Sequence, residues 1–145
     1  MITVSYYYDR VDTSLVDEDW ATSICKIIFQ HNNHNVAHIS IIFSNDSRLH
    51  KLKKKYFGVD LLTDTITFNL EDKGDPIDGE IYISLDRVIE NSKLYEQTVV
   101  NELKRVIVHS ILHLLGFKDS TPNDKIKMTE LEEKYISYKI ESNQI

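Results

Sequence analysis

The chain has 145 residues, which is enough for one domain with a substantial core and too few for two. Hydrophobic residues make up 41% and charged residues 28%, a globular composition that excludes global disorder. The formal net charge of −6 argues against a protein that coats nucleic acid non-specifically, and no stretch approaches the roughly 20 apolar residues of a membrane span. We therefore expect one domain over residues 1–145, with no membrane segment.

The first third of the chain predicts two strands around a helix. Alternating apolar residues predict a strand over residues 2–8 and another over 36–43. Thr13 is the predicted N-cap of the intervening helix, which ends near His31 and has acidic residues in its early turns. The one cysteine, Cys25, cannot form an internal disulfide, so we expect a core thiol in a reducing cytoplasm.

A second helix follows, capped within residues 45–47 and ended by Gly58. Its Leu49, Leu52 and Tyr56 should point inward, with the lysines pointing out. This helix carries the chain's only basic cluster, which consists of Arg48, Lys51, Lys53, Lys54 and Lys55, together with His50. Taken alone, such a cluster is more often a solvated helix face than a binding site.

The remaining elements define the fold class. Residues 65–70 and 80–84 predict two strands that pair antiparallel, and a helical piece starts from Asp86. A long helix runs from about residue 98 to 115, and residues 121–124 present an N-cap, a proline at N1 and an acid at N3. That last helix carries the apolar residues Ile126, Met128, Leu131 and Tyr135. Because strands come first and helices gather at the end, we predict an α+β fold: a small, mostly parallel or mixed sheet of about four strands packed by helices.

The end of the long helix predicts a metal site. His109 and His113 stand at i and i+4, so both imidazoles can approach one cation at the roughly 2.0–2.1 Å of zinc–nitrogen bonds. Gly116 can end the helix in the left-handed conformation, and Asp119 can return as a third ligand. Three protein ligands leave a fourth position open for water, as in catalytic zinc sites.

A histidine pair on an apolar helix can also be a satisfied pair of core side chains. This helix is apolar nearly all round and should be central, where burying two imidazoles is unfavourable unless something binds their lone pairs. The Gly-x-x-Asp continuation has no purpose in a plain core helix, so we favour the metal site. With no second cysteine, its ligands must be nitrogen and oxygen.

The spacing is close to the zinc signature of metzincin-type peptidases, in which a glutamate after the first histidine is the general base. Here that position is Ser110, which has no useful basicity, and losing such a base costs roughly 10²–10⁴-fold in rate. Peptide hydrolysis is therefore disfavoured. A phosphodiester fits better, because a metal can polarise a phosphate oxygen and the basic cluster can hold the backbone.

The segment His109–Asp119 resembles the signature of the YbeY family, the endoribonucleases of ribosomal RNA maturation. Further blocks resemble that family in order and spacing across roughly residues 45–135, namely 63–68, 79–84, 102–109 and 128–133. The resemblance implies a zinc-dependent endoribonuclease for single-stranded RNA, acting in late ribosome biogenesis, including 16S rRNA 3′-end processing, and in ribosome quality control. It implies one Zn²⁺ per chain on His109, His113 and Asp119, catalysis through a water on that zinc, a cytoplasmic location, and precursor rRNA and the ribosome or its proteins as partners.

Three positions depart from the family pattern. Asp119 replaces the usual third histidine, Ser110 replaces a glycine, and Phe57 replaces an arginine whose phosphate contact would pass to Lys54 or Lys55. The residues expected to bind RNA are Arg48, Lys51, Lys54 and Lys55. Two alternatives stay open: a zinc metallopeptidase-like hydrolase, and a non-catalytic ribosome assembly factor with a structural metal.

Overall fold

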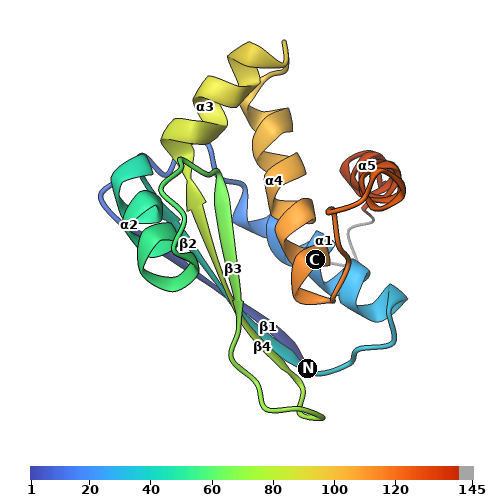
Figure 1. Ribbon diagram of the computed structural model, residues 1–145. Coiled ribbons are helices and arrows are strands. Elements are labelled where there is room, and N and C mark those ends of the chain that lie inside the picture. The colour runs from blue at the N-terminus through green and yellow to red at the C-terminus, as the bar shows by residue number, and fades with distance from the viewer. Residues whose placement is uncertain (141–145) are drawn as a thin grey trace.

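Figure 1 shows the computed structural model of the chain, which describes residues 1–140; the last five residues of the predicted domain, 141–145, lie outside the described part. In chain order the elements are β1 (Ile2–Tyr8), α1 (Glu18–His31), β2 (Ala37–Ser44), α2 (Asp46–Phe57), β3 (Thr65–Asn69), β4 (Ile77–Ser84), α3 (Leu85–Leu94), α4 (Val99–Leu114) and α5 (Pro122–Ile136). The predicted α+β class with a mixed four-stranded sheet is confirmed.

The strands lie in the order β1-β2-β4-β3. β1, β2 and β4 run parallel, and β3 pairs antiparallel with β4, as the sequence predicted. In that pair Thr65 lies opposite Ile83, and Asn69 lies opposite Gly79. β3 is therefore the last strand of the sheet, on the side where α4 runs alongside it (Figure 1).

The two faces of the sheet carry different helices: α1 and α4 cover one face, and α2 lies against the other (Figure 1). Strand alternation explains the division. On β4, Ile81 and Ile83 are fully buried on the α4 side, whereas Glu80 and Tyr82 are only half-buried on the α2 side. The main core thus lies between the sheet and the pair α1 and α4, and α5 packs onto α4.

Close contact with the sheet fixes the end of α4. A Cβ added to Gly79 of β4 would lie 2.7 Å from a methyl carbon of Leu114, so a larger residue there would require the Leu114 side chain to shift. Asn69 of β3 donates its side-chain amide to the Leu114 carbonyl at 3.0 Å and so satisfies one unpaired group of the helix end. The last turn of α4 is therefore held in place by both strands of the β3–β4 pair.

The start of α1 differs from the prediction. Thr13 is not the N-cap; Asp17 is, and its carboxylate accepts the backbone N–H of Trp20 at 3.0 Å. Thr13 instead belongs to a turn in which its carbonyl accepts the N–H of Val16 at 3.1 Å. Both residue types favour the cap position, and the acid next to the helical run occupies it.

The inward face of α2 was predicted only in part. Leu49 is fully buried, but Tyr56 is 56% exposed, so its prediction as a core residue is wrong. Its ring packs edge-on against Phe68 of β3 with centroids 5.3 Å apart, and Phe57 stacks on the same ring. Both rings pack on Phe68 and remain about half exposed.

Other local predictions are confirmed. Gly58 ends α2 with φ of +64°, and Thr121 and Asp124 form a reciprocal capping box at the start of α5. Cys25 is buried, which raises the pKa of its thiol to about 12. Within residues 1–140, no helix combines the length and the apolar character needed to cross a membrane. Ile126 of α5 is 59% exposed, so only part of the apolar set on that helix packs.

Candidate metal centre

The last two turns of α4 bring the histidines together. His109 and His113 lie on the same side of the helix, and their Nε2 atoms are 2.8 Å apart. Both side chains are about three-quarters buried, with 24% and 26% exposed. The predicted i, i+4 pairing is therefore present in the fold, at the edge of the core.

The turn after α4 directs the chain back toward the pair. Gly116 has φ of +96°, its N–H donates to the carbonyl of His113 at 3.0 Å, and that of Phe117 donates to Leu112 at 3.0 Å. These two bonds form a Schellman motif, which needs glycine at the left-handed position. The reversal brings Asp119 over the end of the helix that it follows.

Asp119 completes a three-atom cluster. Its Oδ2 lies 3.3 Å from Nε2 of His109 and 3.4 Å from Nε2 of His113. Ligand atoms of a tetrahedral zinc ion with bonds of roughly 2.0–2.1 Å lie about 3.3 Å apart. The two imidazoles and the carboxylate thus have the atom types and spacing to hold a metal ion.

Each imidazole is also held by its second nitrogen. Nδ1 of His109 lies 2.6 Å from Oε2 of Glu132, and Nδ1 of His113 lies 2.9 Å from the carbonyl of Phe117. Both acceptors favour the tautomer that carries the proton on Nδ1, which leaves the Nε2 lone pair free for a cation. Support of this kind is typical of metal-binding histidines.

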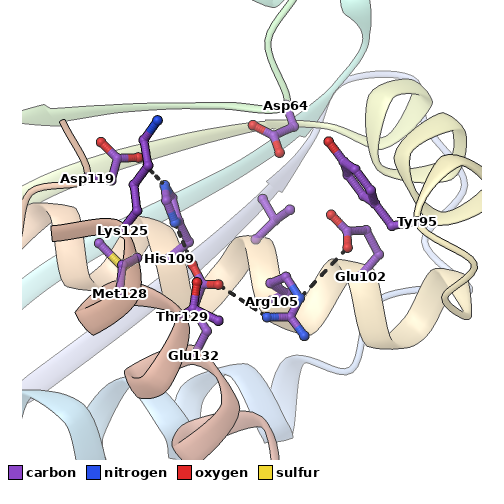
Figure 2. A pocket seen from close by; sticks show the side chains of 11 residues that line it. Asp64, Tyr95, Glu102, Arg105, His109, Asp119, Lys125, Met128, Thr129 and Glu132 are labelled. Atoms are coloured by element: carbon purple, nitrogen blue, oxygen red, sulfur yellow. Dashed lines mark hydrogen bonds and ion pairs between the residues drawn. The ribbon is translucent and has the colours of Figure 1, made fainter. Parts of the chain in front are cut away.

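Glu132 connects the site to a buried ion-pair network. Its side chain is 8% exposed, and its other oxygen accepts from Nη1 of Arg105 at 3.2 Å. Arg105 also donates from Nη2 to the exposed Glu133 at 2.6 Å. Figure 2 shows the resulting chain of contacts from Asp119 through His109, Glu132 and Arg105 to Glu102.

Burial lowers the pKa of His109, but its hydrogen bond to Glu132 and the charges of Glu132, Asp119 and Asp64 outweigh burial, so the net pKa is raised. Burial raises the pKa of Asp64 itself. The site therefore carries an excess of negative charge around its imidazoles, which is the electrostatic setting that a cation stabilises.

Two pockets adjoin the cluster, and His109, Asp119 and Asp64 line both of them. The larger pocket, of about 450 Å³, lies between α4 and α5 and is drawn in Figure 2. The smaller, of about 270 Å³, lies on the β3 side and includes His113 and Lys53. A ligand can thus reach the cluster from two sides.

Ser110 does not take part in the cluster. It is fully buried, donates to the carbonyl of Val106 at 2.7 Å, and lies 2.8 Å from the hydroxyl of Thr65. At the position where a metzincin-type peptidase has its general base, this chain therefore has a serine, whose hydroxyl links α4 to Thr65 of β3.

One lysine of the α2 basic cluster, Lys53, lies at the site, although it is not among the residues predicted to bind RNA. Lys53 lines the smaller pocket, whereas Lys51, Lys54 and Lys55 are exposed on the same helix. The signal was in the sequence, because Lys53 lies one turn after the buried Leu49 and so shares its inward face. The remaining predicted contact, Arg48, is ion-paired with Asp9 at 3.7 Å.

Glu132 was also missed, although its position carries a signal. It follows Met128 by four residues and precedes Tyr135 by three, and both of these neighbours are buried. An acid on the apolar stripe of a helix needs a partner, and here it has His109 and Arg105.

The chain is similar to known proteins over most of its length. Residues 7–139 match the family described as Endoribonuclease YbeY. A protein of that name from Amoebophilus asiaticus is 34% identical over 133 residues, covering 92% of this chain and 90% of its own length. One from Christiangramia forsetii is 39% identical over 121 residues, with 83% of each chain covered. The solution structure of a Thermotoga maritima protein superimposes with a TM-score of 0.65 at 25% identity, covering 92% of this chain and 87% of that one.

Proposed function

Because this chain belongs to the endoribonuclease YbeY family, we propose that it is a zinc-dependent endoribonuclease that cleaves single-stranded RNA. One observation carries the proposal: three ligand atoms converge at 2.8–3.4 Å while both Nδ1 atoms are held elsewhere. Nitrogen and oxygen ligands, three in number, suit one catalytic Zn²⁺ per chain. His109, His113 and Asp119 are its proposed ligands.

When bound, the metal supplies a Lewis acid that polarises a phosphate oxygen and lowers the pKa of water. The chain's own residues prepare the place for it. Glu132 and the Phe117 carbonyl orient the two imidazoles, and the Gly116 turn positions the carboxylate of Asp119. Asp64, whose pKa is raised by burial, lines both pockets and is the proposed group that exchanges a proton with the attacking water.

Lys53 is the proposed phosphate-binding residue next to the metal. Lys53 lines the pocket that includes all three ligands, and its ammonium lies 4.8 Å from the centre of the Phe57 ring. A phosphodiester needs such a cation, because its charge grows on reaction. We further propose that Arg48, Lys51, Lys54 and Lys55 contact the strand beyond the site, where their exposure suits a mobile polyanion.

Family membership supports the biological setting that we propose: precursor rRNA as substrate, the ribosome or its proteins as partners, and roles in 16S rRNA 3′-end processing and ribosome quality control. The free, buried Cys25 supports a reducing cytoplasmic location. The buried contacts of Ser110 argue against the peptidase alternative, because no base stands where that chemistry needs one.

Metal analysis of the purified chain, combined with cleavage of a defined single-stranded RNA, tests the proposal. The wild type should hold about one zinc per chain, and Ala variants of His109, His113 or Asp119 should lose both metal and cleavage. His38→Ala is the matched control, because this histidine is exposed on β2 and should affect neither. Metal binding without cleavage would favour an assembly factor with a structural metal, and full zinc occupancy in the ligand variants would refute the site.

A further inference from the structure

The larger pocket beside the metal ligands contains a carboxylate that the metal site does not use. Glu102 of α4 lines this pocket and is 4% exposed. Within residues 1–140 its side chain accepts no hydrogen bond, and its ion pair with Nε of Arg105 spans 4.0 Å, beyond hydrogen-bond reach. The Nη1 and Nη2 donors of Arg105 are engaged by Glu132 and Glu133.

Burying a carboxylate without a hydrogen-bond donor is unfavourable. Burial raises the pKa of Glu102; the charge of Arg105 opposes this shift, and the charge of Asp64 adds to it. Asp64 also lines this pocket; it is half-buried, and burial raises its pKa although backbone hydrogen bonds at Asp64 and Thr65 oppose the shift. Figure 2 shows both carboxylates at the end of the pocket away from Asp119, together with Tyr95. This end of the pocket therefore offers acceptors that await a ligand with hydrogen-bond donors.

Tyr95 supplies a different surface. It caps the C-terminus of α3, is 59% exposed, and borders the pocket with its ring. An exposed aromatic ring at the rim of a polar pocket is the usual platform on which proteins stack an unpaired base. The volume of about 450 Å³ lies within the range of small-molecule sites and is large enough for a purine nucleoside.

We propose that this pocket binds the guanine base of the nucleotide next to the cleaved phosphate, stacked on Tyr95 with its Watson–Crick edge against Glu102. Guanine presents an imino N–H beside an amino group on that edge, and one carboxylate can accept from both. Uracil presents carbonyl oxygens on either side of its one N–H, and these oxygens would face the carboxylates. This inference rests on the proposed nuclease function and adds a base preference to it.

The test uses single-stranded oligoribonucleotides that are identical except for one position, which holds guanosine, inosine, adenosine, cytidine or uridine. The zinc-loaded wild type should cleave beside guanosine roughly tenfold or more faster than beside uridine, and inosine, which lacks the amino group, should fall between them. Glu102→Gln should reduce these differences to within about twofold, because its amide donates where guanine also donates. Glu90→Gln, an exposed carboxylate of α3, is the matched control and should retain the wild-type preference.

Direct binding of guanosine and uridine monophosphates separates this inference from the nuclease proposal. Tighter binding of the guanine nucleotide, lost in Glu102→Gln and weakened roughly tenfold in Tyr95→Ala, supports the pocket even if no RNA is cleaved. Cleavage without any base preference would overturn the pocket and leave the nuclease standing. Retained preference in Glu102→Gln, or unchanged nucleotide binding in Tyr95→Ala, would overturn it as well. Tyr95 is exposed, so that variant keeps the test valid if Glu102→Gln does not fold.

Discussion

Replacing Glu132 by glutamine should weaken zinc binding although Glu132 is not a ligand. The carboxylate serves two donors at once, accepting from Nδ1 of His109 at 2.6 Å and from Nη1 of Arg105 at 3.2 Å. Glutamine has one oxygen, so its NH₂ group must face one of these donors. If it faces His109, the imidazole proton moves to Nε2, where it blocks the metal. Loss of such supporting contacts typically costs 10–100-fold in metal affinity, and we expect about tenfold for Glu132→Gln and about a hundredfold for Glu132→Ala.

The assay is competition for zinc between the full chain and a chromogenic chelator, with thermal unfolding followed in parallel. Glu133→Gln is the control, because Glu133 also accepts from Arg105, at 2.6 Å, but is 62% exposed and does not touch His109. It should change zinc affinity by less than about twofold, as an exposed ion pair contributes little. Wild-type affinity in Glu132→Gln, or equal losses in the two variants, would refute the reasoning.

Further predictions concern Ser110, the lysines of α2 and Cys25. Ser110→Ala should leave RNA cleavage within about tenfold of wild type, and a larger loss would give Ser110 a catalytic role. Ser110→Glu should lower the melting temperature, because it forces a carboxylate against β3, and an unchanged melting temperature would contradict this. Lys53→Gln should reduce the cleavage rate at saturating RNA, because Lys53 lines the pocket beside the metal ligands. Neutralising Lys51, Lys54 and Lys55 together should instead reduce the slope of log binding constant against log salt concentration by about 0.7 per lost contact. An unchanged slope would make these three lysines a solvated surface. Cys25 should resist iodoacetamide near neutral pH until urea unfolds the chain, because burial raises its pKa to about 12; rapid labelling of the native chain would be the contrary result.

The grouping of His109, His113 and Asp119 could be predicted from the sequence because the geometry that joins them is local. Two residues one helical turn apart share a face, and a glycine in the left-handed conformation reverses the chain within a few residues. Both features are present, at His109 and His113 and at Gly116 with φ of +96°. No long-range packing is needed to bring these three ligands into one place.

The supporting residues could not be placed in the same way, because they come from elements far apart in the chain. Glu132 reaches His109 only when α5 packs on α4, and Lys53 reaches the pocket only when α2 packs against β3 and β4. Helical periodicity puts Lys53 on the face of Leu49 and Glu132 on the face of Met128, but it does not indicate what they contact, and the prediction that the α2 lysines point outward is wrong for Lys53. The wrong N-cap prediction at Thr13 has a simpler origin. Asp17 is also a favoured N-cap residue and directly precedes the first residue of α1, so it occupies the cap position.

The acidic net charge and an RNA substrate are compatible because the two sides of the metal cluster differ in chemistry. The β3 side has Lys53, which suits a phosphate, and the α5 side has Glu102 and Asp64, which suit the donor edge of a base. An RNA strand that crosses the cluster can place a phosphate beside Lys53 and a base beside Glu102 and Asp64. Ser110 provides no base for peptide hydrolysis, because its hydroxyl is buried against the Val106 carbonyl. In the proposed function the arrangement around His109 selects a nucleotide by two contacts of opposite kind, which an average over the whole chain's charge conceals.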